Sequence, residues 1–80
     1  MRIHIKFFAM GRELIGQDAL ELEMPAETDV NDVLAALERQ FPAFSRLPSF
    51  LTAVNMTYVP RDTRLNDGDE LAIIPPVSGG

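Results

Sequence analysis

The chain has 80 residues, an apolar fraction of 46 % and no cysteine, so it can build one small core but no disulfide, thiolate metal site or cysteine nucleophile. Twelve acidic against seven basic residues give a net charge of −5, which argues against a nucleic-acid partner and favours a basic protein surface. No apolar run reaches the roughly 18 residues of a membrane span, and the chain starts with strand-like alternation instead of a signal peptide, so we expect a cytoplasmic protein without membrane contact.

The first part of the chain predicts a hairpin of two strands. Residues 1–8 and 19–24 each alternate between apolar and polar side chains, which is the period of a half-buried strand. Glycines and an aspartate interrupt the segment 9–18, which leaves room for a single helical turn. We therefore expect an antiparallel pair joined by a long loop.

One clear helix follows Pro25. Thr28 or Asp29 can cap its N-terminus, and the carboxylates of Asp29 and Asp32 suit the positive end of the helix dipole. Pro42 ends the helix. Its apolar residues recur at the spacing of one helical face: Val30, Val33, Leu34, Leu37 and Phe41.

The second part predicts an irregular crossover and three more strands. The crossover, 43–50, carries the apolar anchors Phe44, Leu47 and Phe50. Residues 51–59 can form a short hairpin, Asp67-Gly68 favours a tight turn, and residues 70–74 form the last strand. The order strand, strand, helix, strand, strand, strand predicts an α+β fold of the β-grasp (ubiquitin-like) type, a five-stranded mixed sheet with one main helix packed on one face. Residues 1–74 would form this domain and residues 75–80 a flexible C-terminal tail.

One face of the predicted sheet lies away from the helix. Arg2, His4 and Lys6 suit that face, but Phe8 does not. If the first and last strands are neighbours, as a β-grasp sheet requires, Phe8 meets Ile74, and Tyr58 can join them from the adjacent hairpin. Single exposed apolar side chains are common, but three that converge beside the terminus favour a docking patch.

No catalytic or metal-binding set can be assembled from the sequence. His4 is the only histidine, and a metal site needs further ligands. The acidic residues at 67–70 lack the spacing of a calcium loop, and the glycines at 11 and 16 lack the Lys-Ser/Thr pair of a phosphate-binding loop. We expect a chain that is no enzyme by itself and binds no metal.

The C-terminal end is the most unusual feature. Two prolines stiffen the exit from the last strand, and the final glycines present only backbone, so they can enter a channel too narrow for a Cβ atom. A frayed end is the ordinary interpretation of terminal glycines, but it does not explain a double glycine after two prolines. The residues are Pro75, Pro76, Val77, Ser78, Gly79 and Gly80.

The ending "PPVSGG", with "LNDGDELAII" before it and "FFAMGREL" near the start, resembles the small subunit of molybdopterin synthase, a ubiquitin-like sulfur carrier, along essentially the whole chain. The resemblance implies that an adenylyltransferase similar to ubiquitin-activating enzymes uses ATP to adenylate the Gly80 carboxylate, and that a sulfurtransferase system converts it to a thiocarboxylate. The loaded tail would enter the large synthase subunit, in a heterotetramer, and two such carriers would supply the dithiolene sulfurs of molybdopterin. The chain itself would bind no cofactor.

The resemblance also implies residue roles. Phe8, Tyr58 and Ile74 would contact the large subunit and, in turn, the activating enzyme, while Arg12 would form a salt bridge with the activating enzyme. Gly80 would be the covalent site, Gly79 a steric requirement, and residues 75–78 a guide for threading.

Two alternatives remain open. A ubiquitin-like modifier would end with Gly80 in an isopeptide bond to target lysines. A carrier for thiamine synthesis, cysteine synthesis or tRNA thiolation would deliver the same sulfur to another acceptor. All of these share activation of Gly80, and the Pro-Pro-Val run favours molybdopterin synthesis over thiamine-type carriers, which usually lack it.

Overall fold

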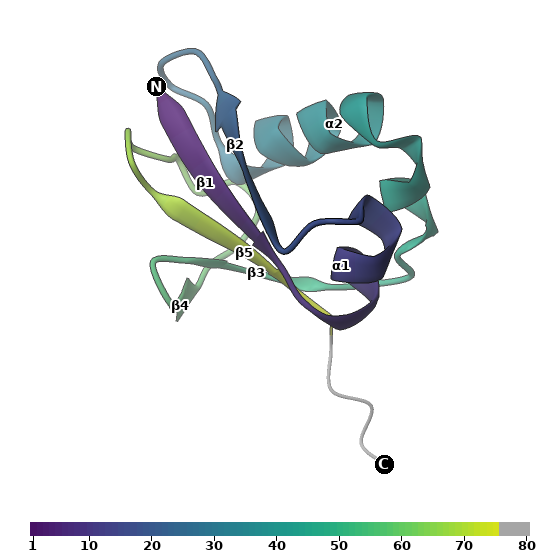
Figure 1. The fold of residues 1–80 in the computed structure, drawn as a ribbon. Helices are drawn as coiled ribbons and strands as arrows, with labels where there is room; N and C mark the ends of the chain where they lie inside the picture. The colour runs from purple at the N-terminus through teal and green to yellow at the C-terminus, as the bar shows by residue number, and fades with distance from the viewer. Residues whose placement is uncertain (76–80) are drawn as a thin grey trace.

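The computed structural model describes residues 1–75, and residues 76–80 lie outside the described part. The chain begins and ends the described fold with a strand, and these two strands are neighbours in the sheet (Figure 1). The elements are β1 (Arg2–Phe7), α1 (Ala9–Ile15), β2 (Ala19–Glu23), α2 (Val30–Gln40), the 3₁₀ helix η1 (Pro42–Arg46), β3 (Leu51–Val54), β4 (Thr57–Tyr58) and β5 (Glu70–Ile74).

The strands form one mixed sheet in the order β2-β1-β5-β3-β4. The central pair, β1 and β5, is parallel, with Phe7 opposite Ile73, and the other pairs are antiparallel. Figure 1 shows α1 and α2 on the same side of this sheet. The predicted β-grasp fold with a five-stranded mixed sheet is therefore confirmed, and one face of the sheet carries no helix.

The main helix, α2, starts where the sequence predicted. Asp29 is its N-cap: the Asp29 carboxylate accepts a hydrogen bond from the Asp32 backbone N–H at 2.9 Å, and the Asp32 carboxylate accepts one from the Asp29 N–H at 3.0 Å. This reciprocal pair caps the first turn of the helix, and the Asp32 N–H also donates to the Asp29 carbonyl at 3.1 Å. Its buried residues are four of the predicted five, Val30, Val33, Leu34 and Leu37.

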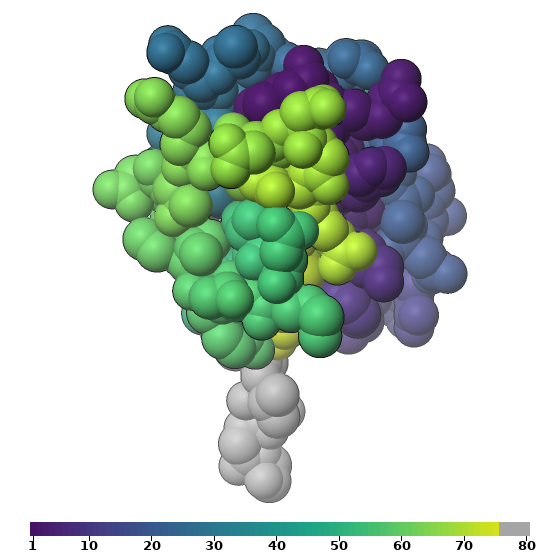
Figure 2. Space-filling model, turned by 90° about the vertical axis from the view of Figure 1, so that its left-hand side faces the viewer, coloured from purple at the N-terminus to yellow at the C-terminus, as the bar shows by residue number. Residues whose placement is uncertain are grey.

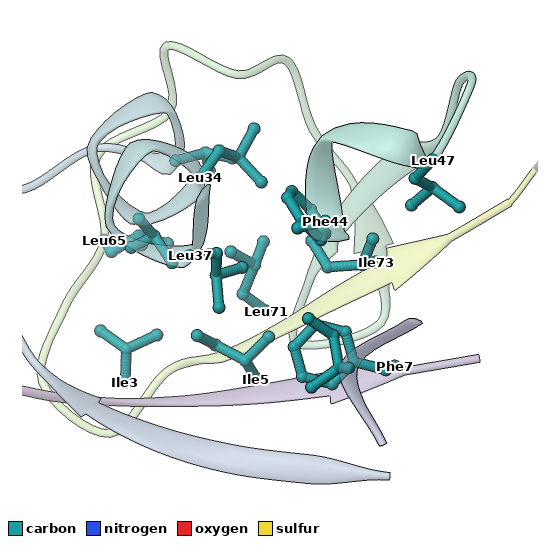
Figure 3. Packing of buried hydrophobic residues seen from close by; sticks show 13 residues of the cluster. Ile3, Ile5, Phe7, Leu34, Leu37, Phe44, Leu47, Leu65, Leu71 and Ile73 are labelled. Atoms are coloured by element: carbon teal, nitrogen blue, oxygen red, sulfur yellow. The ribbon is translucent and has the colours of Figure 1, made fainter. Parts of the chain in front are cut away.

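The core lies between the sheet and the helices (Figure 3). Ile3 and Ile5 of β1 and Leu71 and Ile73 of β5 are fully buried, and they pack with Leu37 of α2 and with further side chains from η1. Each such side chain stabilises the fold by about 1.5–3 kcal/mol. Side chains alternate between the two faces of a strand. The burial of these four residues of β1 and β5 therefore determines which of their neighbours lie on the open face of the sheet.

Two connections are more regular than predicted. A longer helix, α1, replaces the single turn expected within residues 9–18. It ends at Gly16, which has φ 82° and donates its N–H to the Arg12 carbonyl at 2.8 Å. Gly11 lies inside this helix and is buried, and a Cβ there would lie 3.9 Å from Leu47 and 4.0 Å from Phe7. Both distances are ordinary van der Waals contacts, so the packing leaves room for a Cβ, and the glycine does not interrupt the helix.

The expected irregular crossover contains η1, in which Phe44 is buried as predicted. The tight turn at Asp67-Gly68 is also confirmed, with Gly68 at φ 85° and the Asp69 N–H donated to the Asn66 carbonyl at 3.0 Å. None of the helices within residues 1–75 is long and apolar enough to cross a bilayer.

Candidate functional site

The open face of the sheet has a charged half and an apolar half. In the charged half, Arg2 and His4 of β1 face Glu21 and Glu23 of β2, with Arg2 Nη2 at 3.1 Å from Glu23 Oε1 and His4 Nδ1 at 3.2 Å from Glu21 Oε1. Figure 2 views the molecule from this side, with β3, β5 and β1 next to one another across its middle. The polar residues predicted for this face are therefore found on it.

The apolar half is a hollow of about 320 Å³. Its floor is made by Ala53 of β3 and Ala72 of β5, which lie directly opposite each other in the sheet. Because these alanines are short, the larger side chains around them stand above the floor and leave a depression. The hollow is lined by Lys6, Phe8, Ala53, Met56, Tyr58, Glu70, Ala72 and Ile74.

The three side chains predicted to converge on this face all line the hollow. Phe8 follows the last residue of β1 and is 44 % exposed, Ile74 ends β5, and Tyr58 of β4 is 64 % exposed and lies opposite Ala53. Phe8 has an extended backbone, which continues the alternation of β1 into the start of α1. Their predicted meeting is confirmed, and their role in docking a partner stays a prediction.

Charged groups border the hollow on one side. Lys6 Nζ of β1 lies 3.9 Å from Glu70 Oε2 of β5. Arg12, the predicted salt-bridge donor, lies on α1 and does not line the hollow; its Nε is 3.6 Å from Asp18 Oδ1, and its side chain is more than half exposed. Its guanidinium can therefore change partners, and its role toward an activating enzyme stays a prediction.

Two features of the hollow were not predicted from the sequence, the alanine floor and Met56. Alternation alone places Ala72 on the same face as Ile74, but only the register of β3 against β5 shows that Ala53 lies opposite Ala72. Met56 lies in the turn between β3 and β4, where no alternation pattern predicts the direction of a side chain.

The hollow lies beside the end of β5, the last strand of the described structure. Because β1 and β5 are parallel, the ends of both strands reach the same edge of the sheet, so Phe8 and Ile74 border that edge together. Pro75 follows directly and is partly buried. The other predicted site residues, Pro76, Val77, Ser78, Gly79 and Gly80, lie outside the described residues.

Within residues 1–75, no three side chains of the metal-binding types come close enough together to hold a metal ion. The feature that stands out in the described part is the apolar hollow beside the end of β5.

Comparison with known proteins gives consistent similarities. Residues 5–80 match the ThiS family. The chain is 40 % identical over 80 residues to the molybdopterin synthase sulfur carrier subunit of Escherichia coli (strain K12), with 98 % of this chain and 99 % of the relative covered. Its fold is similar to that of SAMP1, small archaeal modifier protein 1, from Haloferax volcanii, with a TM-score of 0.90, 29 % identity and both chains covered in full. It is also similar, with a TM-score of 0.73, 25 % identity and full coverage of both chains, to a chain in the complex of subunits 1 and 2 of molybdopterin-converting factor from Helicobacter pylori.

Proposed function

The chain belongs to the ThiS family and is a sulfur carrier subunit of molybdopterin synthase, acting in molybdenum cofactor biosynthesis, and from this premise we propose that it carries the sulfur as a thiocarboxylate on Gly80. The observation that supports the proposal best is the position of the apolar hollow at the edge where the chain leaves β5, with residues 76–80 still to follow. A partner bound at the hollow would hold the end of β5 in a fixed position, and the residues that lead to Gly80 would start from there.

The chemistry requires activation by another protein. A carboxylate is a poor electrophile, so in the proposed first step a Gly80 carboxylate oxygen attacks the α-phosphorus of ATP within an activating enzyme and pyrophosphate leaves. Hydrosulfide supplied by the sulfurtransferase system then attacks the carbonyl carbon, the bond from that carbon to the AMP oxygen breaks, and the thiocarboxylate forms as AMP and one proton leave. The thiocarboxylate supplies the nucleophile that this chain, which has no cysteine, otherwise lacks. ATP is consumed by the activating enzyme, and the carrier itself is non-catalytic.

The length and composition of residues 75–80 suit delivery into a buried active site. An extended chain spans about 3.3–3.6 Å per residue, so these residues reach about 20 Å from the edge of the hollow. Pro75 and Pro76 favour an extended backbone, and Val77 and Ser78 continue it. Gly79 and Gly80 have no side chain to exclude them from a narrow channel.

We propose the large synthase subunit as the partner that binds the hollow, in a heterotetramer, and the activating enzyme as a second partner that uses the same face earlier in the cycle. The similarity to a chain solved in complex with subunit 2 of molybdopterin-converting factor supports the first assignment. Phe8, Tyr58 and Ile74 provide the apolar contact. The net charge of −5 favours a basic partner surface around them.

Co-expression with the large subunit from the same genome tests this assignment. We expect the two chains to co-purify as a non-covalent assembly with equal numbers of each subunit. The similarity to SAMP1 favours a second candidate, a protein modifier joined to lysines through Gly80. A ladder of covalent adducts that survives denaturation, without a stable complex with the large subunit, would favour the modifier and contradict the carrier.

A further inference from the structure

We propose that Met56, at the tip of the β3–β4 turn, is a further contact residue that extends the docking surface of the hollow for the large synthase subunit. The inference rests on the proposed function, because it names the same partner. Met56 lines the hollow, yet its side chain is 92 % exposed, more than any other large apolar side chain in the described residues. The fold of the isolated chain therefore does not bury this thioether.

The backbone at Met56 is also unfavourable for methionine. The turn between Val54 and Thr57 has two central residues, Asn55 at φ 49° and Met56 at φ 71°. Positive φ at both positions corresponds to a type I′ turn, in which Asn-Gly is strongly preferred because a Cβ disfavours this backbone region. Asparagine tolerates positive φ at the first position, but methionine at the second position adopts it only at an energetic cost. A side chain that the fold neither buries nor favours locally suggests a use outside the isolated domain.

The base of the turn is held in place. The Asn55 side chain donates to Asp69 Oδ1 at 2.9 Å and accepts the Glu70 backbone N–H at 3.0 Å, and the Asn55 N–H donates to the Glu70 carbonyl at 2.9 Å. These bonds tie the tip of the hairpin to the start of β5. A partner that contacts Met56 does not need to order the turn first, so more of the contact contributes to affinity.

The chemistry of methionine fits this position. Its unbranched side chain adapts to an irregular apolar surface, and its sulfur interacts well with aromatic rings. Met56 borders the same hollow as Tyr58 and Ile74, so one partner surface can cover all three. We expect the Met56 side chain to enter an aliphatic or aromatic pocket on the large subunit, next to the surface that covers the hollow.

Three variants test the inference by measuring the Kd for the large subunit and the melting temperature of the free chain. In Met56→Gly, we expect the Kd to rise about tenfold, because most of one apolar side chain is lost from the interface, and the melting temperature to rise by about 4 °C, because glycine suits the turn. Met56→Leu keeps an apolar side chain and should bind within about threefold of the wild type. The matched control is Glu27→Gly, which relieves a similar φ of 69° in the turn before α2, on the helix side of the sheet, and should leave the Kd unchanged.

A wild-type Kd for Met56→Gly would overturn the inference and leave the proposed function intact. An equal loss of affinity in Glu27→Gly would also overturn it, since the effect would then come from the turns and not from the thioether. If the wild-type chain does not bind the large subunit, the proposed function and this inference both fail.

Discussion

Removal of Gly80 is expected to reduce sulfur transfer by more than about a hundredfold while leaving the melting temperature nearly unchanged. The new C-terminal carboxylate would lie about 3.3–3.6 Å short of its place in the partner's active site, and a misplacement of 1 Å can already cost about a hundredfold in rate. The core, in contrast, is complete before this residue, because the last buried apolar side chain of the described structure is Ile73. Transfer is measured as molybdopterin formed by a synthase reconstituted with purified components, and stability by thermal unfolding of the free chain.

Gly79→Val tests whether transfer depends on the volume of the C-terminal residues as well as on the length of the chain. This variant keeps the length and the terminal Gly80 but adds a β-branched side chain to the part that should enter a narrow channel, so we expect transfer to fall strongly here too. Ser78→Ala serves as the control, since it changes the segment without adding volume, and it should transfer sulfur normally. A collapse of the melting temperature on removal of Gly80 would make this residue structural and contradict its role as the sulfur-bearing end.

Phe8→Asp is expected to weaken binding to the large subunit by about a hundredfold without loss of stability. The substitution removes an apolar contact from the rim of the hollow and places a carboxylate where the partner must exclude water. In the free chain Phe8 is the N-cap of α1 and makes no side-chain cap hydrogen bond, while aspartate is among the best N-cap residues. The gain of a cap therefore offsets the lost packing. Affinity is measured by titration calorimetry and stability by thermal unfolding.

The charge-matched control is Met10→Asp. Met10 lies on the same helix, is exposed to a similar degree and does not line the hollow. The substitution adds the same negative charge as Phe8→Asp. Because this charge lies outside the hollow, the affinity should stay within about threefold of the wild type. Equal weakening by both substitutions would point to net charge instead of the hollow, and unchanged affinity in Phe8→Asp would remove the hollow from the docking surface.

Those parts of the fold that depend on strong local patterns could be predicted from the sequence. The alternation of residues 1–8 and 70–74 identified the central strands, and the capping residue with the apolar spacing of residues 30–41 identified α2. The meeting of Phe8, Tyr58 and Ile74 followed from combining that alternation with the β-grasp order of strands. Period and topology together were enough to place these side chains on one face.

The remaining features depend on tertiary contacts that a local pattern does not contain. Gly11 reads as a helix breaker, but it lies buried inside α1, next to Leu47 and Phe7. The floor of the hollow depends on which alanines the β3–β5 register brings together, and the position of Met56 depends on a turn without the usual glycine. Packing and register determine these features, and a single sequence indicates them only weakly.

We propose that the C-terminal carboxylate of Gly80 is the group that accepts sulfur, and intact mass spectrometry shows whether it does. The purified chain is incubated with ATP, the activating enzyme and a sulfur source, with a chain lacking Gly80 as control. We expect the wild-type chain to gain the mass difference of one sulfur for one oxygen, located by fragmentation at Gly80, and the shortened chain to gain nothing. A wild-type mass that stays unchanged under conditions in which the activating enzyme modifies another carrier would contradict this proposal.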